Sequence, residues 1–331
     1  MYKSFYKLTR NPFEITPDPS FLFPTRRHNE ALAALYYGVR RRKGFVVMTG
    51  EVGTGKTLLV RCLLELLNRR NMAYAYVFNS RLSPDEFLQY VAGDFGLPTA
   101  GKNKSDLLLE LGSYLIGRHQ KRLTTVLVVD EAHHLSVDVL EEIRLLTNLE
   151  TAQEKLLQIL LVGQPELDEK LDSVALRQLK QRIALRSQLE PLTLEETRGY
   201  VERRLQLAGA NSHGPALFPP ESLVRVYRHS RGIPRLVNTL CENALITGFA
   251  RQVPVVGAEI IDEVAADFRL HVVSEPAPTP PPAREAGEPR ESGEVWQAVK
   301  TLLQLHDYLQ SMRSHESEDP PLPAETRSHR A

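Results

Sequence analysis

The chain has 331 residues, of which 42% are hydrophobic and 25% charged, and its 41 basic side chains balance 41 acidic ones. This length allows two or more domains with a substantial core. A net charge of zero gives no overall attraction to nucleic acid or to anionic lipid. Because no apolar run approaches the roughly 20 residues of a membrane span, and the N-terminal stretch lacks the apolar segment of a signal peptide, we predict a cytoplasmic protein. Any contact with the inner membrane would then be made through a partner.

The two cysteines, Cys62 and Cys241, each lie in an apolar, helix-like stretch, and neither has a partner at metal-ligand spacing. We predict that both are reduced residues of the core, as is usual in cytosolic proteins.

After an N-terminal segment, residues 1–43, apolar strand-like runs alternate with helical patterns. Such alternation predicts a parallel sheet with helices on both faces, and the almost wholly apolar run "TTVLVVD" is typical of a strand buried on both sides. We therefore predict an α/β domain over residues 44–192. Its expected strands are residues 44–49, 73–79, 124–130, 156–163 and 183–189, and its expected helices are residues 55–70, 83–95, 104–121 and 136–149.

The strand pattern stops at Thr193, which is followed three residues later by Glu196, the spacing of a helix-capping box. Further helices are expected at residues 220–229, 232–251 and 257–270, so residues 193–272 are predicted to form a small all-helical domain. Residues 273–293 are rich in Pro, Glu and Ala and read as a disordered linker. One amphipathic helix with a tail is expected in residues 294–331.

The stretch "GEVGTGKT", residues 50–57, matches the P-loop pattern in full and lies where that pattern must lie, between a strand and a helix. Glycines let the backbone wrap closely around phosphate oxygens, with N–H groups and the N-terminal end of the helix pointing inward. An incidental glycine-rich turn is the alternative. We predict ATP as the ligand, with Lys56 reaching the β- and γ-phosphates and the Thr57 hydroxyl coordinating Mg²⁺. The expected nucleotide-binding residues are Gly50, Glu51, Val52, Gly53, Thr54, Gly55, Lys56, Thr57 and Leu58.

Asp130 and Glu131 end a very apolar strand in "VLVVDEAHHL". A strand-end Asp holds Mg²⁺ in P-loop NTPases, so we expect Asp130 to bind the metal and Glu131 to act as the general base for the attacking water. The alternative is that the pair merely caps the next helix. Beside a full P-loop, the Asp130–Glu131 pair favours an ATPase over a protein that only binds nucleotide. His133 and His134 lack a matching Cys or His cluster, so a loop or core role is expected for them rather than zinc binding.

The motifs "GEVGTGKT", "VLVVDEAHHL", "LLVGQPEL", "LRQLKQRI" and "GIPRLVN", together with the N-terminal stretch, resemble the AAA+ ATPases of the ExeA/GspA (general secretion pathway protein A) type over about residues 1–270. The resemblance implies a P-loop NTPase (AAA+) sheet with a helical lid and an oligomer. It also implies ATP hydrolysis that drives conformational change in a bacterial secretion or envelope/exopolysaccharide assembly system.

Several residue roles follow from this resemblance alone. Gln164 falls at the sensor-1 position and Arg235 at the sensor-2 position, from which it would reach the nucleotide out of the lid. Arg182 lies in the arginine-finger region, with Arg177 and Arg186 as rivals and a solvated basic helix face as the competing interpretation. His28 and its neighbours would lie near the adenine.

The basic run at residues 40–43 is interpreted as a helix C-terminus rather than a nucleic-acid site. Two other functions stay open. One is a DNA-targeting transposition ATPase of the TniB/MuB type, which zero net charge and the absence of interleaved aromatic and basic residues disfavour. The other is an adaptor that binds nucleotide without turning it over, against which Glu131 and the finger candidates argue.

Overall fold

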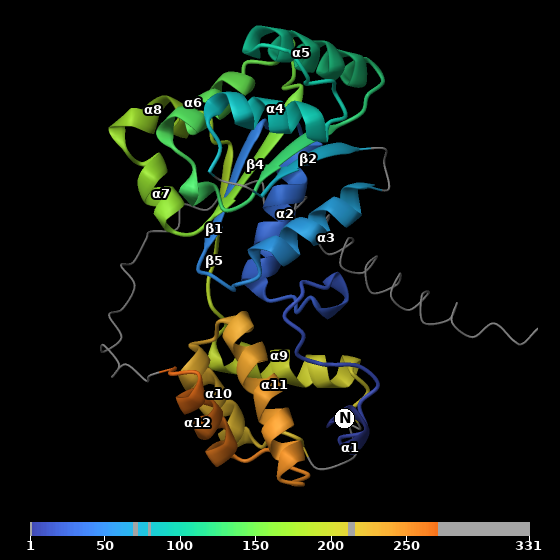
Figure 1. The fold of residues 1–331 in the computed structure, drawn as a ribbon, viewed down its shortest axis with the longest axis vertical. Helices are drawn as coiled ribbons and strands as arrows, with labels where there is room; N and C mark the ends of the chain where they lie inside the picture. The colour runs from blue at the N-terminus through green and yellow to red at the C-terminus, as the bar shows by residue number, and fades with distance from the viewer. Residues whose placement is uncertain (1, 69–71, 79–80, 211–215, 271–331) are drawn as a thin grey trace, which may run out of the picture. The chain divides into compact units, whose positions relative to one another are not determined.

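The computed structural model describes residues 2–68, 72–78, 81–210 and 216–270, all within one unit, Met1–Pro281 (Figure 1). The predicted linker over residues 273–293 and the predicted amphipathic helix of residues 294–331 lie outside the described residues.

The five predicted strands form one parallel sheet in the order β2-β3-β4-β1-β5. The strand that was expected at residues 183–189 begins two residues late, because Ile183 N–H still donates to the Lys180 carbonyl in the turn before it. The strands are β1 (Phe45–Gly50), β2 (Ala73–Val77), β3 (Thr125–Val129), β4 (Leu157–Gly163) and β5 (Leu185–Leu189).

This strand order determines where the functional loops meet. From β1 the chain crosses to the far edge at β2, returns through β3 and β4 to the side of β1, and ends beyond it with β5. All strands run the same way, so the loops that follow them emerge at one edge of the sheet, and β1 lies at the point where the order reverses. The P-loop, Asp130 and Gln164 follow β1, β3 and β4 at this edge.

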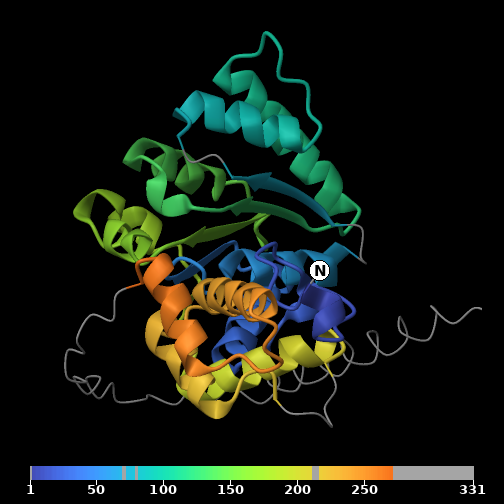
Figure 2. The same ribbon diagram turned by 60° about the horizontal axis from the view of Figure 1, so that its bottom comes forward.

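In the three central strands, β1, β3 and β4, every residue is buried, and alternate side chains face helices on opposite sides of the sheet, as the apolar runs predict. Phe45 and Val47 of β1 face one helical layer, whereas Val46 and Met48 face the other. Figures 1 and 2 show the two layers on either side of the sheet. The first holds α4 (Pro84–Asp94), α5 (Lys104–Gln120), α6 (Val137–Leu146), α7 (Glu166–Leu171) and α8 (Arg177–Lys180), and the second holds α2 (Arg26–Arg40) and α3 (Lys56–Asn68).

Helix α2 ends at Arg40, so the basic run at residues 40–43 does begin at a helix C-terminus, where cations are favourable. Short 3₁₀ turns at η1 (Pro19–Phe21), η2 (Ala132–His134) and η3 (Val174–Leu176) complete the α/β part.

Beyond β5 the chain is helical, as predicted. The capping box is present, since the Thr193 hydroxyl accepts from Glu196 N–H and the Glu196 side chain accepts from Thr193 N–H. The helices are α9 (Leu194–Leu207), α10 (Pro220–Ser230), α11 (Pro234–Ala250) and α12 (Ala258–Asp267). Across the described ranges, no helix has both the length and the apolar composition that a bilayer span requires.

The N-terminal segment, which includes α1 (Tyr2–Phe5), packs into the core of this helical region. Tyr6, Leu8 and Phe13 are buried there. The Thr9 hydroxyl donates to the Ala208 carbonyl at 2.9 Å, and the buried guanidinium of Arg204 donates to the Pro12 carbonyl at 2.7 Å. The apolar pattern of the sequence did not indicate this pairing of distant segments.

Both cysteines are free and buried, which confirms their predicted place in the core. Burial raises the pKa of the Cys62 thiol to about 12 and also raises the pKa of Cys241.

Candidate nucleotide-binding site

The P-loop connects β1 to α3, and its glycines occupy positions where a side chain would be strained or crowded. Gly53 and Gly55 have φ of 81° and 101°, a region that glycine adopts without the usual penalty. A Cβ on Gly53 would lie 2.6 Å from the Cβ of Arg235, and one on Gly50 would lie 2.8 Å from the Leu189 carbonyl oxygen. The loop therefore keeps a narrow, side-chain-free cradle of the kind that phosphate requires.

Lys56, the first residue of α3, is only 6% exposed. Its Nζ donates to the carbonyl oxygens of Gly50 and Glu51, at 2.7 and 2.9 Å. Burial lowers the pKa of the Lys56 ammonium, and the charges of Glu131 and Asp130 act in the opposite direction. The ammonium thus lies among backbone oxygens and near both carboxylates that follow β3.

Asp130 is buried and receives three donors. Thr57 Oγ1 and the Tyr76 hydroxyl donate to Oδ2, at 3.1 and 2.7 Å, and Glu131 N–H donates to Oδ1 at 2.9 Å. A hydroxyl oxygen and a carboxylate oxygen are therefore adjacent at the mouth of the P-loop, and Mg²⁺ prefers oxygen ligands of this kind. The predicted pair fits a magnesium ion.

Tyr76 is a site residue that sequence reasoning missed. It lies on β2, opposite Val128 of β3, two residues before Asp130. Burial, together with the adjacent Asp130 carboxylate, raises the pKa of the Tyr76 phenol, which therefore stays a hydrogen-bond donor. No motif carries this residue. The only signal is the alternation in "AYAYV", which places Tyr74 and Tyr76 on the same face of the strand.

Glu131 adopts a left-handed backbone conformation, with φ 51° and ψ 36°. For a residue other than glycine this conformation is uncommon, and where it persists it often marks a functional site. The side chain is 46% exposed, yet its Oε2 is buried and has no hydrogen-bond partner among the described residues. The carboxylate is thus both open to solvent and incompletely satisfied.

Gln164 follows β4 directly, as predicted, and contacts the ring of His133. Its backbone N–H donates to His133 Nδ1 at 3.4 Å, and its side-chain amide lies 2.9 Å from His133 Nε2. His133 Nδ1 lies 3.4 Å from Glu131 Oε2. His133, which the sequence assigned to a loop or core role, therefore contacts both the predicted base and the predicted sensor.

Arg235 lies in the first turn of α11 beside the P-loop, and its backbone N–H donates to the Gly53 carbonyl at 3.2 Å. Gly232, just before this helix, has φ 73° and lets the backbone pass close to Leu192, since a Cβ there would lie 1.9 Å from the Leu192 carbonyl oxygen. The Arg235 side chain is exposed and has no hydrogen bond or ion pair within the part of the chain that the structure describes. It is free to reach a bound ligand.

His28 is buried against the P-loop backbone. Its Nε2 lies 3.1 Å from the Thr54 carbonyl oxygen, and its Nδ1 lies 2.6 Å from Thr25 Oγ1. A carbonyl only accepts, so we assign the ring proton to Nε2 and let the Thr25 hydroxyl donate to Nδ1. Burial lowers the pKa of His28, in keeping with this neutral ring.

Comparison with known proteins agrees with this geometry. Residues 39–171 match the family described as AAA domain. Over 252 residues the chain is 45% identical to General secretion pathway protein A of Aeromonas hydrophila. The chain is an AAA-type P-loop NTPase. The resemblance to the ExeA/GspA type is thereby confirmed, over 76% of this chain and 45% of its relative, so the chain spans less than half the length of that protein.

Solved structures support the fold of this AAA protein. The Aeropyrum pernix ORC1 protein in complex with DNA aligns with a TM-score of 0.60 and 19% identity, over 79% of this chain and 70% of that one. Drosophila ORC bound to DNA aligns with a TM-score of 0.58 and 20% identity, over 81% and 66% of the two chains. At such identities the likeness concerns the fold alone.

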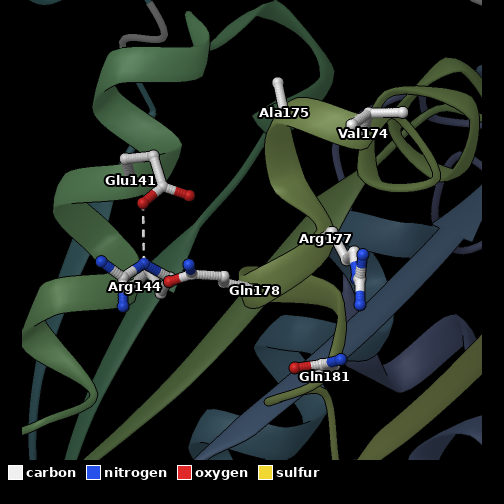
Figure 3. Close-up of a pocket in the computed structure, with 7 residues that line it drawn as sticks. All are labelled: Glu141, Arg144, Val174, Ala175, Arg177, Gln178 and Gln181. Atoms are coloured by element: carbon white, nitrogen blue, oxygen red, sulfur yellow. Dashed lines mark hydrogen bonds and ion pairs between the residues drawn. The ribbon is translucent and has the colours of Figure 1, made fainter.

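The three finger candidates of the AAA protein have different surroundings. The guanidinium of Arg182 donates to Thr147 Oγ1 at 2.9 Å, and that of Arg186 lies 3.1 Å from Asp168 Oδ1. Arg177 is exposed and makes no hydrogen bond or ion pair within the described residues. It lines an open hollow of about 570 Å³ between α6 and the η3–α8 segment (Figure 3). Two candidates are thus held by their own chain, and the third points at solvent.

Proposed function

We propose that this AAA protein binds ATP with Mg²⁺ at residues 50–57 and hydrolyses it. The observation that carries the proposal is the contact of Thr57 Oγ1 with Asp130 Oδ2 at 3.1 Å, beside a buried P-loop lysine and an open carboxylate at Glu131. A site that only binds nucleotide does not need the Glu131 carboxylate, so its presence favours hydrolysis.

In the proposed reaction a water molecule attacks the γ-phosphorus and the bond to the β,γ-bridging oxygen breaks, giving ADP and phosphate. Glu131 accepts the proton of the water, and Lys56 offsets charge on the β- and γ-phosphates. Thr57 and Asp130 would hold Mg²⁺, whose charge, when bound, offsets that of the phosphate oxygens. Gln164 is suited to orient the water or the γ-phosphate by hydrogen bonding.

The helical region offers a way to couple hydrolysis to a conformational change. Because the Arg235 backbone N–H is hydrogen-bonded to the Gly53 carbonyl, we propose that the Arg235 guanidinium contacts the γ-phosphate and that α11 shifts when this phosphate leaves. An arginine from a second copy of the chain would complete the site from outside, with Arg182 or Arg177 as the finger.

The identity with General secretion pathway protein A supports a role in secretion or envelope/exopolysaccharide assembly, with a protein partner at the inner membrane. The DNA-targeting alternative is not favoured, because the net charge is zero. Sedimentation of the full chain with inner-membrane vesicles that contain or lack the secretion machinery would separate the two roles. Association that depends on this machinery supports the proposal, and salt-dependent binding to duplex DNA contradicts it.

Glu131→Gln tests the chemistry, since it keeps the size of the side chain and removes the base. We expect ATP affinity to be retained while steady-state phosphate release falls on the order of 10²-fold or more. Glu202→Gln, at an exposed position in the middle of α9, is the matched control and should release phosphate like the wild type. Equal turnover in the two variants would show that Glu131 is not the general base. If the wild-type protein released no phosphate, nucleotide binding without hydrolysis would be the remaining function.

A further inference from the structure

His133 is a buried titratable group that the proposed reaction does not use. Its side chain is 6% exposed, and it lies between the groups assigned as base and sensor. We propose that His133 is a positioning residue: held by Gln164 in one tautomer, it presents a lone pair rather than an N–H to Glu131 and so keeps the carboxylate unpaired and ready for the water. This inference rests on the proposed ATPase function.

Gln164 determines the tautomer of the His133 ring. The Gln164 backbone N–H donates to His133 Nδ1, so Nδ1 must carry a lone pair and the ring proton is on Nε2. The Nε2–H then donates to the Gln164 side-chain amide 2.9 Å away, with the amide turned so that its oxygen faces the ring. Both ring nitrogens are therefore engaged by one residue.

Glu131 faces the same ring nitrogen. Its Oε2 lies 3.4 Å from His133 Nδ1 and has no hydrogen-bond partner among the described residues. Two acceptors that face each other cannot form a hydrogen bond, so the ring does not quench the basicity of the carboxylate. A donor at the Nδ1 position would pair with Glu131, stabilise its charged form and weaken it as a base.

The charged groups around the ring are consistent with the neutral form. Burial, the neighbouring His134 and the ammonium of Lys56 lower the pKa of His133, against the opposing charges of Glu131 and Glu166. The backbone around the ring is also fixed, because Lys170 Nζ donates to the carbonyls of His133 and Leu135.

The ring also connects Glu131 to Gln164 at the sensor position. If Gln164 shifts, the N–H that holds Nδ1 as an acceptor is lost, and the ring can take a proton there and pair with Glu131. The position of Gln164 thereby decides whether Glu131 is available, so the base works only when the sensor is in place.

Three substitutions at one position test this arrangement. Asn places its side-chain oxygen near the site of Nδ1 and can accept from Gln164 N–H, Ala removes both functions, and Lys offers only donors. We expect His133→Ala to lose about tenfold in kcat, the scale of one hydrogen bond, with the KM for ATP unchanged. His133→Asn should recover most of this loss, and His133→Lys should fall at least as low as His133→Ala.

The matched control is His119→Ala, at a histidine of α5 that contacts Arg42 rather than any residue of the site, which should keep the wild-type kcat. ATP affinity and the melting temperature check that each variant folds, and if His133→Ala does not fold, the comparison of Asn with Lys decides the matter. Equal kcat values for the Asn and Lys variants, or a wild-type kcat in all three variants, would overturn the proposed role of His133. If the wild-type protein hydrolyses ATP in the same assay, the proposed ATPase function stands. A wild type that does not hydrolyse ATP removes both.

Discussion

The phosphate-binding edge and the arginine-bearing segment of residues 177–186 differ in what the chain itself supplies. At the edge, Lys56 donates to two carbonyls of its own P-loop, and Thr57 donates to Asp130 in the loop after β3. In the arginine segment, Arg182 and Arg186 bind side chains of their own chain, and Arg177 is exposed beside an open hollow.

This difference indicates a division of labour. Nucleotide binding needs loops that one chain already brings together, so its residues can be tested one at a time. A finger acts on the nucleotide of a neighbour, so its test requires mixtures of two chains.

The largest effect is expected from Lys56→Ala, which removes the buried ammonium at the phosphate edge. ATP binding with Mg²⁺, measured by calorimetry, and phosphate release should both fall below detection, because no other cation lies inside the P-loop among the described residues. Lys180→Ala, which breaks only an ion pair with Asp172 on the surface, should leave both unchanged. Unaltered turnover in Lys56→Ala would refute the P-loop assignment.

The next effect sharpens the contrast with the arginine segment. If a finger acts between chains, Arg177→Ala or Arg182→Ala should bind ATP normally and lose on the order of 10³-fold in turnover. Mixing the inactive arginine variant with Lys56→Ala should restore activity, since one mixed interface has an intact P-loop and an intact finger. We expect the larger loss for Arg177→Ala, because Arg182 is bound to Thr147.

Arg186→Ala, which breaks the contact with Asp168, is the third arm of the same experiment. Specific activity should also rise with protein concentration. If the activity per chain does not change with protein concentration and no mixture of variants restores activity, the single chain is a complete enzyme. The two regions would then not differ in their need for a second chain.

A smaller effect is expected at Tyr76, inside the phosphate edge. Tyr76→Phe removes the hydroxyl that donates to Asp130 Oδ2 at 2.7 Å, so the carboxylate is less well fixed. Groups that orient metal ligands typically change metal affinity 10- to 100-fold when removed, and we expect about tenfold weaker Mg²⁺ binding in the presence of ADP, measured by calorimetry. Tyr74→Phe, on the same strand and half-exposed, is the control, and equal Mg²⁺ affinity in both variants would contradict this role.

The smallest effect concerns stability rather than turnover. Burial depresses the pKa of His28 from its ordinary value of 6.5 in the folded protein, so the unfolded chain takes up the proton more readily. The contribution of His28 to the free energy of unfolding is then fully present above pH 6.5 and declines as the pH falls below it.

His28→Gln can still donate to the Thr54 carbonyl but does not titrate, so its unfolding free energy in urea should fall less steeply between about pH 6.5 and pH 5. Asn29→Gln, at the next position of α2 and without a titrating group, should keep the slope of the wild type. Parallel slopes for His28→Gln and the wild type would show that folding does not lower the pKa of His28.

The sequence was sufficient for the five strands, their parallel arrangement and the P-loop, because apolar runs and glycine spacing are local features. The place of Asp130 after an apolar strand was also a local feature, whereas Gln164 was singled out only by the family resemblance. Tyr76, His133 and the hydrogen bond of His28 to Thr54 were not found, because they depend on which strands become neighbours. The bond between Arg182 and Thr147 spans 35 residues and left no local pattern, which is why three arginines were indistinguishable.

The pairing of the N-terminal segment with the helical region has a consequence for biosynthesis. Thr9 and its partner Ala208 are separated by 199 residues, and at the usual rate of translation that distance takes roughly 10–40 s to synthesise. Tyr6, Leu8 and Phe13 leave the ribosome long before the helices that bury them. During that interval they are exposed apolar side chains, so a nascent chain arrested before residue 200 should be a better substrate for chaperones than the finished protein.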